Sequence, residues 1–344
     1  MKTKVTINDI AKELGIAPAT VSRALSDHPE ISASTKKKVK TIAERLDYRP
    51  NKMASSLRSG KTKLIGVLIP TAEHLFFGSV IHGISNLASK HGYDVLIYQS
   101  NESEEFEKKG IDTFIAARVD GILASISKNT TNFSHFELAK EKNIPIAFFD
   151  RSNDDLEISS VCTDDYSGAF MATESLIKSG YRRVAHISGP KHIKAFADRI
   201  RGYKAALNEY NMIFNPDLIY NGDISIEAGR KGVQYFLNLE IKPDAIFAVE
   251  DFTALGALKE LKETGIKVPY EFGIIGFCND LFGEHITPSL STVDQKTVQM
   301  GEEAFNLIYE LISKKGEKIN IQKRILTPIL ITRESSKKNS MLFN

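Results

Sequence analysis

The apolar residues at the start of the chain recur at the spacing of three short helices. These positions are Ile7, Ile10, Ala11 and Leu14, then Val21, Ala24 and Leu25, then Val39, Ile42, Ala43 and Leu46. Thr6, with Asp9 three residues later, suits the cap of the first helix. Gly15 permits a sharp turn after that helix, and Pro18 suits the first turn of the second. Together these features predict a helix-turn-helix domain over residues 1–50.

After residue 62 the pattern changes to short apolar runs that alternate with amphipathic stretches. The runs that we expect to be strands are 64–69, 94–98, 121–124, 144–149, 184–187, 245–249 and 272–275. Continuous apolar runs of this length are typical of strands buried on both faces of a parallel sheet, with helices covering those faces. A stretch of about 280 residues exceeds one ordinary sheet domain. The pattern therefore predicts a multidomain chain, with an all-α head followed by two doubly wound parallel-sheet α/β lobes.

Charge is divided unevenly between these parts. The 344 residues have a net charge of +2, but residues 1–60 hold 12 Lys and Arg against 6 Asp and Glu. The head therefore carries +6 and the remainder −4. A basic head on a mildly acidic body favours an anionic polymer as the partner at one end. A solvated basic surface without a partner would give the same count, so charge alone does not decide.

The rest of the composition is that of an ordinary soluble protein, with 42% hydrophobic and 26% charged residues. Cys162 and Cys278 lie far apart and form no CxxC pair, so we expect neither a disulfide framework nor a zinc site. The polar N-terminus lacks the apolar segment of a signal peptide, and no stretch reaches about 18 apolar residues. We therefore expect a cytoplasmic protein with no membrane partner, no metal and no cofactor.

The second predicted helix has the chemistry of a helix that reads DNA. Its outward residues are Ala19, Thr20, Ser22 and Arg23. The short side chains permit close approach to base edges in the major groove, and Arg23 can reach guanine O6 and N7. The lysines expected near phosphates, in salt-sensitive contacts, are Lys36, Lys37, Lys38 and Lys40. On spacing alone, a three-helix bundle that binds protein remains the alternative.

Residues 6–11, 15–16 and 19–25 closely resemble the signature of the LacI/GalR (lac-repressor) family of transcriptional regulators, and the match continues through residues 48–51. The DNA contacts that this resemblance implies are Thr6, Ile7, Pro18, Ala19, Thr20, Ser22, Arg23, Ser32, Thr35, Tyr48, Asn51 and Leu57. Ala17 departs from the family, which usually has serine there, and this puts a phosphate contact from that hydroxyl in doubt.

Residues 51–61 correspond to the hinge helix and linker of the family. The nine residues from Asn51 to Ser59 are too few for a stable isolated helix, so their folding needs a partner. The resemblance implies that two copies pack together on DNA and that Leu57 is an apolar wedge in the minor groove. Alternatively, Leu57 is a linker residue that packs on the core. A ligand that changes the separation of the paired segments would change the affinity for DNA.

The resemblance also implies a periplasmic-binding-protein-like core over residues 62–335. The expected limits are about 62–162 plus 292–323 for one lobe, about 163–291 plus 324–335 for the other, and 336–344 for a flexible tail. Ligands of such sheets bind at the C-terminal ends of strands, in the cleft between lobes. The expected effector contacts are Phe76, Phe77, Asp164, Arg199, Ile224, Glu250 and Cys278. Glu250 departs from the Asn or Asp, and Cys278 from the Asp, that the family often has there.

Other interpretations of these residues stay open. Phe76 and Phe77 can be core residues, and Arg199 can form a structural ion pair. We expect His74 and His82, near the cleft entrance, to be ordinary satisfied histidines. A solute-binding protein for transport would explain the core but not the basic head. The sequence carries no dinucleotide-binding, P-loop, zinc-protease or serine-hydrolase motif, so we predict that the chain is not an enzyme.

These observations predict a sequence-specific transcriptional regulator, most simply a repressor, that binds a pseudo-palindromic operator as a homodimer. A small molecule in the cleft would control it allosterically, and the resemblance favours a sugar or glycoside. The residues after Arg333 are too few for a heptad bundle, so we do not expect a tetramer.

Overall fold

The structure is a computed structural model that describes residues 5–48, 61–316 and 320–338. The chain divides into two compact units between Thr62 and Lys63, and each unit is described by itself. Asn51 and Leu57, the hinge residues expected to contact DNA, lie outside the described residues.

The described part of the first unit contains three helices, as the apolar pattern predicted. They are α1 (Ile7–Leu14), α2 (Pro18–Leu25) and α3 (Ala33–Arg45). Asp9 Oδ2 accepts hydrogen bonds from the Thr6 backbone N–H and hydroxyl, both at 2.8 Å, and this pair of bonds caps α1. Gly15 ends α1 with a left-handed φ of 64°, which glycine adopts without strain. The buried core of this unit consists of Ile10, Ala11, Val21, Ala24, Val39 and Ala43.

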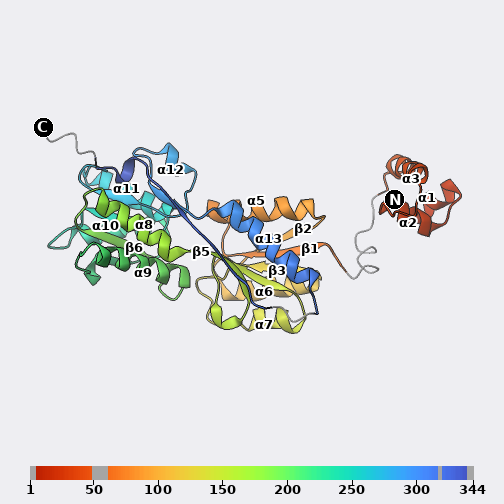
Figure 1. Ribbon diagram of the computed structural model, residues 1–344, viewed down its shortest axis with the longest axis horizontal. Coiled ribbons are helices and arrows are strands. Elements are labelled where there is room, and N and C mark those ends of the chain that lie inside the picture. The colour runs from red at the N-terminus through yellow and green to blue at the C-terminus, as the bar shows by residue number, and fades with distance from the viewer. Residues whose placement is uncertain (1–4, 49–60, 317–319, 339–344) are drawn as a thin grey trace. The chain divides into compact units, whose positions relative to one another are not determined.

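A six-stranded parallel sheet lies in the second unit (Figure 1). In spatial order its strands are β11 (Lys323–Leu326), β5 (Ser159–Thr163), β4 (Ile146–Phe149), β3 (Gly121–Ala124), β1 (Leu64–Ile69) and β2 (Asp94–Gln99). The helices α5 (Leu75–Lys90) and α13 (Thr297–Ser313) cover one face, where Val80 and Ile308 are buried. The helices α6 (Glu104–Ala116) and α7 (Ser134–Glu141) cover the other, where Phe114 and Phe136 are buried.

A four-stranded parallel sheet forms the other part of this unit (Figure 1). Its strands are β7 (Ile219–Asn221), β6 (Val184–Ser188), β8 (Ala245–Ala248) and β9 (Gly273–Ile275). The helices on one face are α8 (Asp165–Lys178) and α9 (Lys194–Glu209), and those on the other are α10 (Ile226–Leu237) and α11 (Asp251–Glu263). A short helix, α12 (Phe282–His285), follows β9. Helices on both faces of both sheets confirm the predicted doubly wound α/β architecture.

Three stretches of chain connect the two sheets. The first runs from β5 into α8, the second passes through β10 (Thr292–Asp294) into α13, and the third leaves β11 through β12 (Ile329–Ile331). The strands β10 and β12 pair with each other in antiparallel fashion. The short 3₁₀ turns are η1 (Asp154–Leu156), η2 (Pro216–Leu218) and η3 (Glu334–Ser336).

Two details differ from the segment limits expected from the sequence. The strand β11 pairs with β5 in the six-stranded sheet and runs to Leu326, so this sheet extends past the limit near 323 that was expected for the first lobe. Ser336, expected in the flexible tail, is buried, and its hydroxyl lies 2.7 Å from the Ser291 hydroxyl. Hydrogen bonding thus holds the start of the expected tail against the core. The remaining limits of the lobes stay predictions.

Candidate functional site

One face of α2 carries the side chains that the sequence assigned to base reading. The exposed or half-buried residues of this face are Pro18, Ala19, Thr20, Ser22 and Arg23. Val21 and Ala24 lie on the opposite side, in the core of the head. The N-cap is Ala17, which makes no side-chain capping hydrogen bond. The helix thus presents short side chains and one arginine to solvent, an arrangement that permits close approach to base edges.

The ion pair of Arg23 is weak and exchangeable. Its Nη1 lies 3.5 Å from Glu30 Oε2, and the two side chains are 58% and 68% exposed. Exposed pairs of this kind contribute about 1 kcal/mol or less, so the guanidinium can leave Glu30 for another acceptor. On α3, Lys36 Nζ lies 3.0 Å from Asp27 Oδ1. The exposed lysines of α3 are Lys37, Lys38 and Lys40.

Other residues expected to contact DNA have structural roles within the head. The Ser32 hydroxyl accepts a hydrogen bond from the Thr35 backbone N–H at 3.2 Å and so caps α3. Thr6 caps α1 in the way described above. Ile7 and Tyr48 are half-buried and pack against the core of the head. Contacts of these residues with DNA stay predictions.

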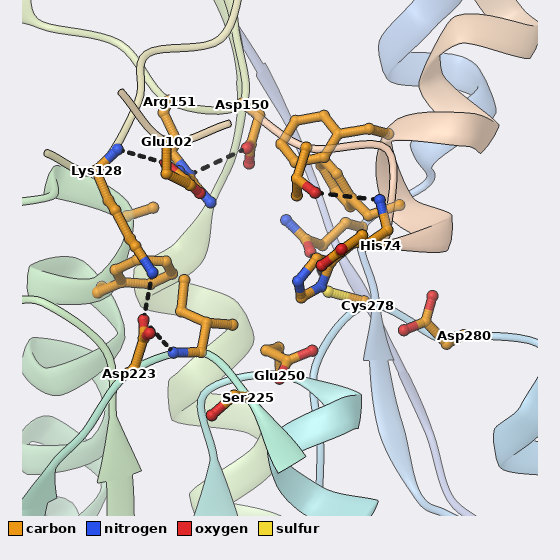
Figure 2. Close-up of a pocket in the computed structure, with 18 of the residues that line it drawn as sticks. His74, Glu102, Lys128, Asp150, Arg151, Asp223, Ser225, Glu250, Cys278 and Asp280 are labelled. Atoms are coloured by element: carbon orange, nitrogen blue, oxygen red, sulfur yellow. Dashed lines mark hydrogen bonds and ion pairs between the residues drawn. The ribbon is translucent and has the colours of Figure 1, made fainter. Parts of the chain in front are cut away.

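In the second unit, a cavity of about 280 Å³ opens at the carboxyl ends of the strands of both sheets (Figure 2). Residues that follow β1, β3 and β4 line one side, and residues that follow β7, β8 and β9 line the other. Parallel sheets bind ligands at this edge because the loops after the strands meet there. The sequence-predicted effector contacts on the wall are Phe76, Phe77, Arg199, Ile224, Glu250 and Cys278.

Asp164 is the predicted effector contact that the cavity wall does not include. Its side chain turns back on α8, where Oδ1 accepts from the Ser167 N–H at 3.0 Å and Oδ2 from the Ser167 hydroxyl at 2.7 Å. The first N–H groups of a helix need such an acceptor, and Asp164 supplies it. The neighbouring Asp165 lies behind the wall and pairs with Arg199, which lines the cavity.

Arg199 lines the cavity and also forms the structural ion pair that the sequence left open. It is 3% exposed, and its Nε donates to Asp165 Oδ1 at 2.8 Å and its Nη1 to the Val249 carbonyl at 2.5 Å. The guanidinium lies 3.7 Å from the centre of the Phe277 ring. Burial raises the pKa of Asp165 to about 6, although Arg199 favours its ionised form.

Aromatic side chains form the apolar part of the wall. Phe76 and Phe77 are buried in the core of the six-stranded sheet, and their rings meet edge to face with centres 5.0 Å apart. Phe196 adds a ring from α9. His74 also lies on the wall, with its ring 5.4 Å from that of Phe252. His82 is not part of the wall, and its Nε2 lies 3.0 Å from Asn86 Nδ2.

Sequence reasoning missed the ion pairs of the cavity. Lys128 Nζ lies 2.5 Å from Asp223 Oδ1, and this contact joins the loops after β3 and β7 (Figure 2). Arg151 Nη1 lies 2.9 and 3.0 Å from the two carboxylate oxygens of Glu102. The partners are 95 and 49 residues apart, so no local pattern reveals them. One feature of the sequence could have identified Arg151 as a residue of the cavity: it follows the apolar strand β4 by two residues.

Glu250 and Cys278, which depart from the family pattern, both lie on the wall. Glu250 is 4% exposed and accepts from the N–H groups of Phe252 at 3.0 Å and Thr253 at 2.7 Å. Cys278 has a φ of 122°, a conformation that residues other than glycine rarely adopt, and its Sγ donates to Gln295 Oε1 at 3.1 Å. Burial raises the pKa of the Cys278 thiol well above its ordinary value. An uncommon backbone conformation therefore lies at the cavity.

Among the described residues, none of the helices is long and apolar enough to cross a membrane. The same parts of the chain contain no group of three or more His, Cys, Asp or Glu that could hold a metal ion. The cavity offers carboxylates, guanidinium groups and phenyl rings, and this chemistry suits a small organic ligand.

Family descriptions match both units. Residues 6–51 match the bacterial regulatory proteins of the lacI family, and residues 62–331 match the periplasmic binding proteins and sugar binding domain of the LacI family. Catabolite control protein A of Priestia megaterium is 33% identical over 90% of this chain and 93% of its own length. The transcriptional repressor CytR of Escherichia coli K12 is 32% identical over 98% of this chain and 97% of its own.

Solved structures agree with these matches. The transcriptional regulator CelR in complex with cellobiose is 25% identical, with a TM-score of 0.73 over 96% of this chain and 99% of that one. The lac repressor dimer bound to operator and the anti-inducer ONPF has a TM-score of 0.85 over 97% and 99% of the two chains, and at 23% identity it shows the shared fold. The relatives are regulators rather than enzymes, as predicted. The helix-turn-helix head, the two-sheet core and these matches together show that this chain belongs to the LacI family of bacterial transcriptional regulators.

Proposed function

We propose that this chain represses transcription by binding a pseudo-palindromic operator as a homodimer, under the control of a small molecule in the cavity. The observation that carries this proposal is the combination of two features in one chain. The head exposes one face of α2 with Arg23 on it, and the core has a cavity at the strand ends of both sheets. One unit suits DNA and the other suits an effector.

The head recognises DNA through α2 in the major groove. Ala19, Thr20 and Ser22 are short enough for the helix to lie close to the bases, and Arg23 pairs with a guanine. The exposed lysines of α3 contribute positive charge near the phosphates. Because the target is chromosomal DNA, we place the protein in the cytoplasm.

A sugar or glycoside is the effector class that the cavity suits best. Phe76, Phe77 and Phe196 offer apolar surface to the carbon atoms of a ring, while the surrounding polar groups can bind hydroxyls. CelR, a structural relative, was solved with cellobiose. The cavity is lined from both sheets, so a ligand there can favour one arrangement of the sheets over another.

Two features favour a homodimer: the two half-sites of a pseudo-palindromic operator and the short hinge segment. The expected hinge, residues 51–59, lies outside the described residues, but nine residues are too few for a stable isolated helix, and a second copy would supply the partner. The lac repressor with the same fold is a dimer on its operator. Two heads would then contact two half-sites about one helical turn apart.

Arg23→Ala is expected to reduce the preference for one base pair in each half-site by about 1–3 kcal/mol, because the variant loses the pairing with guanine. Fluorescence anisotropy titrations against operators substituted at each position would measure this preference. The ion pair with Glu30 is too exposed for its loss to unfold the head.

Lys37→Ala is the matched control, since Lys37 is exposed on α3. It is expected to weaken binding to all sequences by a similar factor and to reduce the salt dependence by about one unit of slope. If Arg23→Ala gave the same uniform loss as Lys37→Ala, Arg23 would be a phosphate contact and the proposed base reading would be rejected.

A further inference from the structure

The cavity wall holds more carboxylates than cations. The acidic residues on the wall are Glu73, Glu102, Asp150, Asp223, Glu250 and Asp280, and the lysine and arginine residues are Lys128, Arg151 and Arg199. Each of these three cations already has a carboxylate partner. Lys128 pairs with Asp223, Arg151 pairs with Glu102, and Arg199 pairs with Asp165 behind the wall. The described wall therefore has no uncompensated lysine or arginine with which to hold an anionic ligand.

Asp280, by contrast, has no cation. It follows β9, is 6% exposed, and its carboxylate forms no hydrogen bond or ion pair with any described residue. Its backbone N–H donates to Asp251 Oδ2 at 2.7 Å, which holds the loop, while the Asp280 carboxylate lines the cavity. In Figure 2, Asp280 and Glu250 are drawn at the same cavity, and no dashed line reaches the carboxylate of Asp280. A buried polar group of this kind normally has a partner.

The surroundings of Asp280 disfavour its negative charge. Burial, with the charge of Glu250 as a second cause, raises the pKa of Asp280 to about 6. The charged group that acts on Asp280 is Glu250, the N-cap of α11. The nearby cations have other carboxylate partners, since Arg199 pairs with Asp165. Arg333, which contacts Asn279, pairs with Glu284. At neutral pH the Asp280 carboxylate thus faces the cavity without a cation. It lies beside Glu250, whose carboxylate accepts hydrogen bonds from the start of α11 and still carries its negative charge.

We propose that the effector is a sugar that carries a protonated amine, with the ammonium group bound at the carboxylates of Glu250 and Asp280. This inference rests on the proposed effector function. A neutral sugar would leave the charge of Asp280 uncompensated, and a phosphorylated sugar would bring a further negative charge beside it. The described residues contain no group of three or more His, Cys, Asp or Glu that could hold a metal ion in place of the amine.

The test is isothermal titration calorimetry of the full chain at pH 7 with three matched sets of sugars. Each set contains a hexosamine, its parent hexose and the hexose 6-phosphate, built on glucose, galactose or mannose. We expect one hexosamine to bind at least about tenfold more tightly than its parent hexose, because an ammonium–carboxylate contact is stronger than a neutral one. We expect the phosphates not to bind.

Asp280→Asn should remove this preference, so that the hexosamine binds no better than the hexose. The Asp280 carboxylate has no partner among the described residues, and its pKa is raised by burial, so loss of its charge should not destabilise the folded state at pH 7. The thermal midpoint of unliganded Asp280→Asn should therefore be no lower than that of the wild type, which separates lost binding from lost folding. Glu137→Gln is the control, since it neutralises an exposed carboxylate on α7 and should keep the preference.

Each outcome decides the matter. A preference for a hexosamine that Asp280→Asn abolishes and Glu137→Gln keeps supports the inference. A hexose that binds as tightly as its hexosamine, a hexose phosphate that binds, or a preference that survives in Asp280→Asn overturns it and leaves the sugar effector in place. If none of the sugars binds the wild type, the proposed amino-hexose effector is rejected, and simple hexoses are excluded from the broader class of sugars and glycosides.

Discussion

Ile10→Ala is expected to abolish specific operator binding while leaving the core of the protein folded. Ile10 is fully buried at the centre of a head whose core contains only five other buried apolar residues within the described part. Truncation of a buried isoleucine to alanine costs about 2–5 kcal/mol. Small domains have little stability in reserve, so a loss of this size unfolds most of the head.

Operator titration by fluorescence anisotropy would measure the loss of binding, and limited proteolysis would locate the unfolding. Because the chain divides into two compact units, fragments of the head should appear while the core resists cleavage. Ile213→Ala, an identical change at a residue that is 93% exposed, should bind operator as the wild type does. Wild-type operator affinity in Ile10→Ala would contradict the role given to the head.

Arg199→Ala is expected to destabilise the core by about 3–5 kcal/mol, because it leaves the buried Asp165 without its cation. The same change removes the donor to the Val249 carbonyl and the contact with the Phe277 ring. Urea denaturation of the full chain, followed by circular dichroism, would report the transition of the core. Loss of the effector response in this variant would not by itself show that Arg199 touches the effector.

Two controls separate stability from binding. Arg201→Ala removes an exposed arginine of the same helix, whose partner is Asp198, and should change stability by less than about 1 kcal/mol. In the double variant Arg199→Met with Asp165→Asn, neither charge remains, so much of the lost stability should return. If Arg199→Ala were as stable as Arg201→Ala, the structural importance of the buried ion pair would be refuted.

The periodicity of apolar residues was sufficient to predict the head and most of the buried strands. The strands that the sequence did not reveal are β5, β7, β10, β11 and β12. They are short, and several carry polar residues, as in the Ser-Ser-Val-Cys-Thr sequence of β5. The strand β5 is buried inside the sheet, but its polar residues interrupt the apolar run on which the prediction depended. The strands β7 and β11 lie at sheet edges and β12 lies in a connection, so they are not buried on both faces and lack such a run.

The cavity could be predicted in part, because side chains after parallel strands converge on one edge. From that rule the sequence correctly predicted that Glu250 and Cys278 line the cavity. It did not reveal the direction of the Asp164 side chain, which depends on the need to cap α8. The same rule could not predict the ion pair between Lys128 and Asp223, because this contact depends on how two loops that are distant in sequence meet.

The central claim is that the head of this protein reads DNA sequence, and a selection from randomised duplexes tests it most directly. The full chain would be incubated with the pool, with and without the hexoses and hexosamines named above, and the bound duplexes sequenced. The account predicts enrichment of a pseudo-palindrome with two related half-sites, and a change in its recovery when the effector is present. Retention of all sequences in proportion to their abundance, under every condition, would contradict it.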